Sequence, residues 1–407
     1  ILETHFHADF ISGHLELNKK YGVPIIFGHN AVPAYDFLGK KDGEIIEVGK
    51  VKIKIIHTPG HTLESVCYLL IDENGNDHAL FTGDTLFIGD VGIPDVAQRY
   101  QNTTKEELAS ILYESLEKLM LLSDDVIVYP GHGKGTQCGK NLSSETSSTI
   151  GKQKRLNYAL NFSRKEDFIK SICSNIPEPP DYFIEAVNKN ANGYIYQEKI
   201  INQSNNPINQ VKFLELLDNE NYIIIDTRNP DEFAKKHIKK SINIGLNGSF
   251  AISAGNLIKA NKKIILICKK GREKESIIRL SRVGFDNIIG YLDSSIDRSF
   301  DDKYLSSIPQ INSTEVSDKS EFQILDVRTK SEYDNSHLSG SMNLPLYDII
   351  KNYKKLDRGT KYLVHCQTGY RSMIASSILR NYDFDVVEIK DGLQGFIKSN
   401  SKELIIY

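Results

Sequence analysis

An internal repeat in the second half of the chain constrains its architecture more than any other feature. Residues 223–228, Ile-Ile-Ile-Asp-Thr-Arg, return as residues 323–328, Gln-Ile-Leu-Asp-Val-Arg. Three further positions recur at the same offset of 100 residues: Glu232 as Glu332, His237 as His337, and Asn243 as Asn343. Solenoid repeats are much shorter, so this period indicates two copies of one domain. The order strand, Asp-x-Arg, helix, strand, loop, helix predicts an α/β domain with a parallel sheet.

The 407 residues leave room for at least one further domain before the repeat. Apolar runs predict strands at 25–27, 51–56, 66–71, 79–81 and 126–129. Leucines at helical spacing predict an amphipathic helix over 105–122. Residues 161–207 are polar and include a Pro-rich stretch at 177–180, which predicts an extended connector. We therefore expect an α/β domain over 1–160, a connector over 161–207, and repeat copies over 208–300 and 308–400.

Charge and composition exclude several classes of protein. Lys+Arg is 50 and Asp+Glu is 53, whereas a general nucleic-acid binder normally carries a basic surplus. No apolar run reaches the roughly 18 residues that span a bilayer. Five cysteines are too sparse for a disulfide-stapled fold, so we expect a cytoplasmic protein, and we expect a homo-oligomer. The chain begins with Ile and not Met, so we expect further sequence upstream of it.

Histidine and aspartate gather in four short segments, each directly after a predicted strand. The segments are Thr-His-Phe-His-Ala-Asp at 4–9, His-Thr-Pro-Gly-His-Thr at 57–62, Thr-Gly-Asp-Thr at 82–85 and Tyr-Pro-Gly-His-Gly at 129–133. A single histidine is more often a satisfied core or surface residue, but four such clusters at strand ends are hard to explain in that way. Neutral imidazole and carboxylate together suit Zn(II) or Fe(II). The clusters therefore predict a metal site.

These clusters resemble the metallo-β-lactamase superfamily, whose fold is an αββα sandwich with metal at one edge of the sheets; here we expect it to be N-terminally truncated. Residues 82–92, Thr-Gly-Asp-Thr-Leu-Phe-Ile-Gly-Asp-Val-Gly, are similar to the persulfide dioxygenase branch. That resemblance implies one iron, Fe(II), held by His5, His61 and Asp84. It also implies that three more residues bind a second metal or surround the first: His7, Asp9 and His132.

Phe10 departs from the pattern of the superfamily, which usually has His after this aspartate. A phenyl ring does not ligate a metal, so the second metal position loses a ligand and a mononuclear site is favoured. Two histidines and one carboxylate on one face of Fe(II) leave positions open for substrate sulfur and O2.

The loop after a predicted strand at 362–366 carries a second candidate site. Cys366-Gln-Thr-Gly-Tyr-Arg-Ser372 leads into an apolar helix, and backbone N–H groups and the positive end of the helix dipole stabilise a thiolate or persulfide anion at such a position. Residues 310–400 resemble a rhodanese sulfurtransferase domain. The resemblance implies that Cys366 carries sulfane sulfur and that Arg371 and the loop amides steady its charge.

The first copy is also similar to rhodanese, but its loop is altered. Cys268 is followed by Lys-Lys-Gly-Arg-Glu-Lys-Glu, and Glu273 and Glu275 would repel a thiolate. We therefore predict a degenerate, structural copy. Cys67 and Cys173 are expected in the core. Cys138 lies just after His132 in the sequence, and the sequence does not decide whether it lies near the metal site.

Together the motifs resemble a family that fuses a persulfide dioxygenase to rhodanese domains. The resemblance implies oxidation of a small thiol persulfide, carried by glutathione, coenzyme A or a similar thiol, to sulfite by O2. Cys366 would then transfer sulfane sulfur to sulfite and give thiosulfate. One alternative is a zinc hydrolase of the glyoxalase II type that cleaves thioesters. Another is a sulfide sensor or scaffold without activity.

Overall fold

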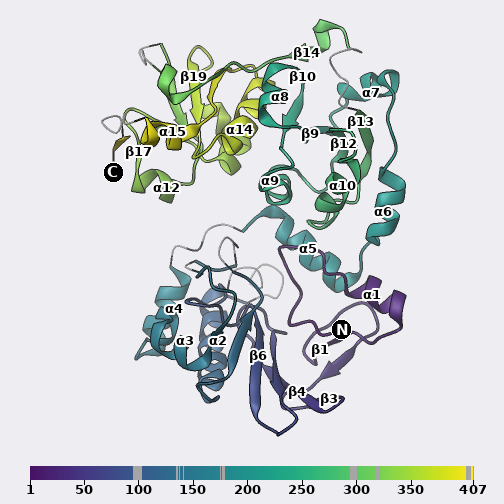
Figure 1. The fold of residues 1–407 in the computed structure, drawn as a ribbon, viewed down its shortest axis with the longest axis vertical. Coiled ribbons are helices and arrows are strands. Elements are labelled where there is room, and N and C mark those ends of the chain that lie inside the picture. Colours follow the sequence, from purple (N-terminus) through teal and green to yellow (C-terminus); the bar gives the residue numbers. More distant parts are fainter. Residues whose placement is uncertain are drawn as a thin grey trace. The chain divides into compact units, whose positions relative to one another are not determined.

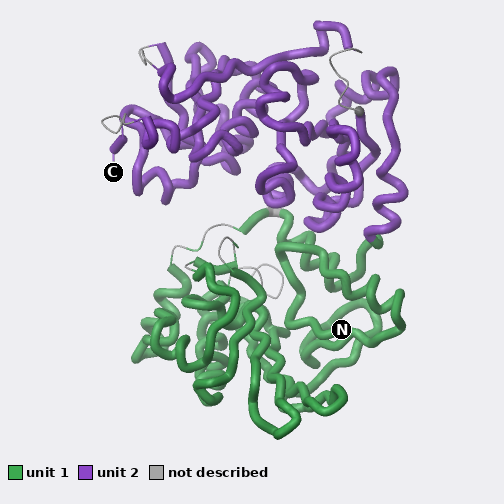
Figure 2. The backbone as a smooth tube through the Cα atoms, in the orientation of Figure 1, with its two compact units in different colours: residues 1–196 green, residues 197–407 purple. Residues whose placement is uncertain are grey.

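The computed structural model describes residues 1–94, 103–133, 136, 138–140, 142–174, 176, 179–293, 300–316, 321–399 and 405–406. The chain divides into two compact units, residues 1–196 and residues 197–407, drawn in green and purple in Figure 2. We describe each unit by itself. Among the described residues, no helix combines the length and the apolar character needed to cross a bilayer.

The main sheet of unit 1 has the strand order β3-β4-β5-β6-β7-β8. Its strands are β3 (Ile45–Val48), β4 (Val51–His57), β5 (Val66–Ile71), β6 (Asp77–Gly83), β7 (Ile127–Pro130) and β8 (Ser148–Thr149). Neighbouring strands are antiparallel except β6 and β7, which are parallel. A small parallel sheet pairs β1 (Ile26–Gly28) with β2 (Leu38–Lys40). The polar segments of the sequence follow the ends of β4, β6 and β7.

The helices of unit 1 are α1 (His14–Tyr21), α2 (Lys105–Leu119), α3 (Ile150–Leu156), α4 (Lys165–Cys173) and α5 (Asp181–Asn192). Helix α2 begins with a capping box between Thr104 and Glu107, which satisfies free N–H groups of its first turn. Its predicted leucine face is buried in the core of the unit, together with Leu69, Leu80 and Val128 of the sheet. Figure 1 shows α2, α3 and α4 gathered on the same side of β6.

The segment 161–207 differs from the extended connector that its polarity predicted, because it contains α4, α5 and α6 (Gln197–Ser204). Phe168 and Ile172 of α4 are buried in the core of unit 1. They are spaced one helical turn apart among polar residues, so their apolar stripe is narrow and the segment has a polar average composition. Residues 177 and 178 of the Pro-rich stretch lie outside the described residues.

The first repeat copy forms a parallel sheet with the order β11-β9-β12-β13. Its strands are β9 (Tyr222–Asp226), β11 (Ser241–Asn243), β12 (Lys263–Cys268) and β13 (Ile288–Asp293). Its helices are α7 (Gln210–Leu217), α8 (Pro230–Lys235), α9 (Phe250–Leu257) and α10 (Glu273–Ser281). A short antiparallel pair joins β10 (His237–Ile238) to β14 (Leu305–Ser306).

The second copy repeats this plan with the parallel order β15-β20-β19-β16-β18. Its strands are β15 (Gln310–Ile311), β16 (Gln323–Asp326), β18 (Met342–Asn343), β19 (Lys361–His365) and β20 (Asp385–Ile389), and β17 (His337–Leu338) pairs antiparallel with β21 (Ile405–Ile406). Its helices are α12 (Lys330–Asn335), α13 (Ile349–Asn352), α14 (Tyr370–Asn381) and α15 (Gly392–Lys398). Short 3-10 turns lie at 158–160, 302–304, 313–315, 346–348 and 353–355.

The repeated Asp-x-Arg motif forms the same buried ion pair in both copies. Arg228 Nη2 lies 2.7 Å from Asp226 Oδ2, and Arg328 Nη2 lies 2.6 Å from Asp326 Oδ2. In each copy the repeated asparagine, Asn243 or Asn343, donates to the backbone carbonyls of that Asp and that Arg. The motif therefore ties the end of one strand to its neighbour, and the predicted repeat is confirmed as a repeat of structure.

Gly60 provides a test of how α2 packs against the loop after β4. Its φ is +146°, and a Cβ there would clash with Leu112, whose Cα it would approach to 2.5 Å. We expect Gly60→Ala to lower the free energy of unfolding of unit 1 by about 3 kcal/mol, because backbone strain and overpacking add. Calorimetric unfolding measures the effect. Gly13→Ala is the control, because nothing lies within 4 Å of its Cβ position; equal stability of the two variants would contradict the packing described.

Candidate functional sites

A buried carboxylate, Asp84, lies at the centre of the predicted metal cluster, directly after β6. Its Oδ2 lies 3.3 Å from His132 Nε2, 3.5 Å from His61 Nε2 and 3.9 Å from His5 Nε2. Burial by itself would raise the pKa of Asp84, but the contact with His132 and the charges of the three imidazoles hold it below its ordinary value. Within the described residues, neither oxygen of Asp84 has a hydrogen-bond partner. A buried, ionised carboxylate without such a partner is a position that a cation stabilises.

Two of the imidazoles are oriented by hydrogen bonds on their far side. His61 Nδ1 donates to the carbonyl of Ile93 at 2.8 Å, so its Nε2 carries the free lone pair that faces Asp84. His5 Nδ1 lies 2.9 Å from Thr4 Oγ1. Burial lowers the pKa of His5 well below its ordinary value, which keeps this ring neutral. Neutral imidazoles fixed in this way are the form in which histidine binds a metal.

Two glycines allow the backbone to pass close to this carboxylate. A Cβ at Gly92 would collide with the carbonyl oxygen of Asp84 and come within 3.1 Å of His61 Nδ1. A Cβ at Gly131 would lie 2.6 Å from Asp84 Oδ1. The ligating atoms of His5, His61 and Asp84 lie within 4.8 Å of one another. Two imidazole nitrogens and one carboxylate oxygen at this separation fit one metal ion, with Zn(II) and Fe(II) both compatible with the donors.

The other predicted metal residues divide between two environments. Asp9 and His132 come together, with Nε2 to Oδ2 at 3.6 Å, and their ligating atoms lie within 4.8 Å of the thiol of Cys138. His7 instead has its Nε2 3.6 Å from the carboxylate of Glu3, and the ring of Phe10 stacks on it. Burial would lower the pKa of His132, but Asp84 and Asp9 raise it to about 9.

The loop that carries Cys366 is shaped by a glycine. Gly369 has φ +98°, and a Cβ there would collide with the carbonyl of Lys390. Its backbone N–H donates to Cys366 Sγ at 3.2 Å, as expected for a loop amide that steadies a sulfur anion. The Sγ atom also lies 3.6 Å from Ser372 Oγ in the first turn of α14.

Arg371, the other residue predicted for this site, is held by a carboxylate. Its two terminal nitrogens donate to the two oxygens of Glu332, each at 2.7 Å. The Arg371 guanidinium lowers the pKa of Glu332 against the effect of its burial, and this bidentate pair fixes the arginine beside the loop. A direct role of Arg371 in steadying the sulfur charge stays a prediction.

Cys268 of the first copy occupies a similar position with different electrostatics. Its Sγ lies 3.6 Å from Ser276 Oγ. The pKa of the Cys268 thiol is raised to about 11, mainly by burial and also by the charges of Glu273 and Asp226. The expected effect of Glu275 needs correction, because Arg272 forms an ion pair with this carboxylate at 2.6 Å. Burial, more than the two acids, disfavours a thiolate here.

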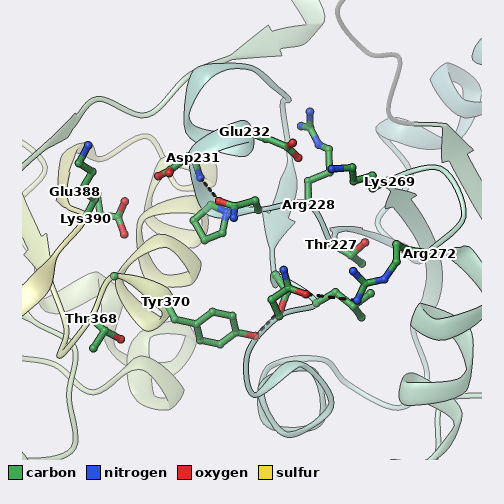
Figure 3. Close-up of a pocket in the computed structure, with 16 residues that line it drawn as sticks. Thr227, Arg228, Asp231, Glu232, Lys269, Arg272, Thr368, Tyr370, Glu388 and Lys390 are labelled. Atoms are coloured by element: carbon green, nitrogen blue, oxygen red, sulfur yellow. Dashed lines mark hydrogen bonds between the residues drawn. The ribbon is translucent and has the colours of Figure 1, made fainter.

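Tyr370 links the Cys366 loop to the first copy. Its hydroxyl donates to the carbonyl of Gly245 at 2.9 Å. A cavity of about 610 Å³ lies between the two copies, and loops of both copies line it. Figure 3 shows Tyr370 reaching from the second copy toward the first, with Lys269 and Arg272 on the far side of the cavity. The first copy thus supports the loop of the second.

Comparisons with known proteins match these two kinds of site. The model of the metallo-beta-lactamase superfamily matches residues 1–132, and the model of the rhodanese-like domain matches residues 209–298 and 313–399. A hydroxyacylglutathione hydrolase of Rhodopseudomonas palustris (strain HaA2) is 37% identical over 134 residues, which cover 32% of this chain and 47% of that protein. The chain thus spans about half the length of such curated relatives.

Two solved structures are also similar. One is a metallo-beta-lactamase from Staphylococcus aureus subsp. aureus COL, which is 29% identical with a TM-score of 0.61 and covers 72% of this chain and 83% of its own. The other is ETHE1 from Myxococcus xanthus, 30% identical over 47% of this chain and 75% of its own, with a TM-score of 0.39. The first domain is a metallo-β-lactamase superfamily domain, and two rhodanese-like domains follow. The predicted fold class and domain order are confirmed.

Gly248 tests the support that the first copy gives to the Cys366 loop. A Cβ at this position would clash with the ring of Tyr370, approaching its Cδ2 to 2.6 Å. We expect Gly248→Ala to displace Tyr370 and to reduce the rate at which Cys366 reacts with iodoacetamide or a sulfane donor by about tenfold. Gly245→Ala is the matched control, since its Cβ would make ordinary contacts of 3.4 Å or more. Equal reactivity in both variants would show that the loop keeps its shape without this contact.

Proposed function

We propose that this chain oxidises small thiol persulfides and passes sulfane sulfur through its last domain. The observation that carries the proposal is the combination, in one chain, of a cluster with two histidines and one carboxylate and a cysteine loop of the rhodanese type. In a chain whose other site consumes persulfide, a loop that carries sulfane sulfur can take sulfur from the same class of substrate. The proposed partners are a persulfide of glutathione, coenzyme A or a similar thiol, together with O2 and sulfite.

The first reaction converts R–S–SH, O2 and water into the thiol R–SH and sulfurous acid, which ionises to sulfite. His5, His61 and Asp84 would hold one Fe(II), which when bound supplies binding and activation of O2 and of the substrate sulfur. The hydrogen bond from His61 Nδ1 to the Ile93 carbonyl presents Nε2 to the site, and burial keeps His5 neutral. Gly92 and Gly131 let the backbone pack closely against Asp84, which fixes this carboxylate in place.

The second reaction takes place at Cys366. Its sulfur attacks the terminal sulfur of a second persulfide, a new sulfur–sulfur bond forms, and the donor thiol leaves. Sulfite then attacks the sulfur carried by Cys366 and departs as thiosulfate, which restores the cysteine. The N–H of Gly369 is placed to hold the negative sulfur at both stages.

The second candidate function is a zinc-dependent thioesterase. It is favoured by the curated relatives, which are named hydroxyacylglutathione hydrolases, and by the approach of Asp9, His132 and Cys138, which could hold a second ion. Phe10 weighs against it, because a phenyl ring stands where a second-metal ligand is expected. Metal analysis after anaerobic purification separates the two functions: one iron supports the dioxygenase, and one or two zinc ions support the hydrolase.

Asp84→Ala tests the metal site. Because the two imidazoles lose the carboxylate that completes the ligand set, we expect the variant to retain less than about a tenth of the iron and to consume no O2 with glutathione persulfide. Metal analysis and an oxygen electrode measure both effects. Asp77→Ala, an exposed acid on the same strand β6, is the matched control and keeps both properties. Full iron content in Asp84→Ala would reject the ligand set.

Cys366→Ser tests the division of labour between the domains. We expect O2 consumption to continue, because the oxidation site lies in the other domain, and sulfite to accumulate in place of thiosulfate. Cys268→Ser is the matched control and should leave thiosulfate formation unchanged, because burial disfavours a thiolate at that position. Mass spectrometry after a sulfane donor should find one extra sulfur on the Cys366 peptide. Wild-type thiosulfate output from Cys366→Ser would refute its role as the carrier.

A further inference from the structure

A fully buried carboxyl group, Glu388 of β20, lies behind the Cys366 loop. Both of its oxygens are engaged: Oε1 accepts from the Ser372 hydroxyl at 2.8 Å, and Oε2 accepts from Gln310 Nε2 at 2.7 Å. It interrupts an apolar strand, Val-Val-Glu-Ile, where a valine or isoleucine would pack without cost. A buried acid in this position needs an explanation beyond packing.

Ser372 connects this acid to the reactive sulfur. Its Oγ lies 3.6 Å from Cys366 Sγ, within reach of the thiol proton, and 2.8 Å from Glu388 Oε1. All three side chains are buried. The thiol can donate to the hydroxyl, and the hydroxyl can donate to the carboxylate or, at 2.9 Å, to the carbonyl of Gly369. The three groups therefore form a continuous line along which a proton can pass.

The groups that face Glu388 come from each element packed against it. Burial raises its pKa to about 7, while the hydrogen bonds from Gln310 of β15 and Ser372 of α14 lower it. This value of about 7 includes the charge of Asp231 in α8, which raises the pKa, and the charge of Lys390, which lowers it. The charge of Arg371, the residue before Ser372, is paired with Glu332.

We propose that Glu388 is a positioning residue for sulfur transfer, which takes up through Ser372 the proton that Cys366 releases. The thiol proton moves to Ser372 Oγ while the serine proton moves to Glu388 Oε1. The products are a thiolate, an intact hydroxyl and a neutral carboxyl group, so the buried site keeps a single negative charge. The new carboxyl donates to Ser372, and Ser372 then donates to the sulfur anion. This inference rests on the proposed role of Cys366 as sulfur acceptor.

The thiolate formed in this way completes the first transfer with balanced atoms. It attacks the terminal sulfur of R–S–SH, the bond from the Cys366 sulfur to that sulfur forms, and the bond between the two donor sulfurs breaks. Cys366 then carries –S–SH, and the donor leaves as R–S⁻. Glu388 also lines the cavity between the copies, together with Thr368 and Gly369 of the loop, as Figure 3 shows for Glu388 and Thr368.

The first copy is an internal comparison. It keeps the thiol and the hydroxyl, with Cys268 Sγ 3.6 Å from Ser276 Oγ, and each serine has a backbone carbonyl as acceptor, Arg272 for Ser276 and Gly369 for Ser372. Ser372 has the Glu388 carboxylate as a second acceptor. In the second copy Glu388 pairs with Val364, two residues before the cysteine, and in the first copy Tyr291 pairs with the equivalent Leu266. In this first copy burial raises the pKa of the Cys268 thiol to about 11.

The test is the pH dependence of alkylation of Cys366. Iodoacetamide labelling of the Cys366 peptide is followed by mass spectrometry in the full chain, from about pH 5 to about pH 10. The wild type should show two steps, the first near the pKa of about 7 of Glu388, because loss of one proton from the pair already yields some thiolate. Glu388→Gln should lack the first step, and between the two steps it should label about tenfold more slowly. Glutamine fits the same space, and its amide oxygen can accept from Gln310.

Ser372 variants separate a proton relay from a structural effect. Ser372→Ala should slow labelling between the two steps by about tenfold to about a hundredfold, since the sulfur anion loses a charge-assisted hydrogen bond. Ser372→Thr keeps the hydroxyl and should restore the first step. Ser276→Ala, the matched change in the first copy, should leave the Cys366 profile as in the wild type.

Two outcomes overturn the proposal. Labelling of Glu388→Gln at or above the wild-type rate would mean that Glu388 only repels the thiolate, and a first step that survives in Ser372→Ala would exclude the path through the hydroxyl. Labelling needs no sulfur donor, so the result is independent of the proposed function. A wild-type pH profile with the first step present, but no extra sulfur on Cys366 after a sulfane donor, would support the relay and reject Cys366 as sulfur acceptor.

Discussion

The chemistry of unit 1 depends on an ionised carboxylate that is buried without a hydrogen-bond donor. Removing a charge from water costs several kcal/mol unless a partner compensates it, and Asp84 has only imidazole nitrogens at 3.3 to 3.9 Å around Oδ2. Either a protonated His132, whose pKa Asp84 and Asp9 raise to about 9, or a metal ion would compensate that charge. The glycines nearby hold this carboxylate in place, because a side chain at Gly92 or Gly131 would displace Asp84.

Unit 2 handles buried charge in the opposite way, with partners from the same short segment. Arg228 and Arg328 each neutralise an aspartate two residues earlier, and both copies keep this pair regardless of the chemistry of their cysteine loops. The pair therefore belongs to the fold. The copies differ in the loop and in the strand behind it. In that strand, Tyr291 of the first copy stands at the position equivalent to Glu388 of the second. These positions can change without disturbing the sheet.

Several features of the site were predictable because they follow strands directly in the sequence. His61 and Asp84 come shortly after apolar runs, and strand ends of one sheet meet at one edge, so their approach could be expected. The neighbourhood of Cys138 and Asp9 was not predictable, because 129 residues separate them and only tertiary packing brings them together. Within 161–207 a helix around Cys173 was expected and is α4, whereas α5 and α6 were missed because polar residues dominate that part of the sequence. Glu388 was missed too, although a lone acid inside an apolar strand was the available signal.

The position of Tyr370 gives the first copy a structural role that does not depend on Cys268. This residue belongs to the Cys366 loop, yet its hydroxyl is bound by the carbonyl of Gly245, and its ring fills the space that the missing side chain of Gly248 leaves. The first copy thus fixes one side of the loop, while Glu388 and Ser372 fix the other side through hydrogen bonds. A thiolate held between a rigid loop amide and a hydroxyl costs little reorganisation when it reacts. Loss of the first copy would leave that loop without its outer support, even though none of the reacting atoms belongs to it.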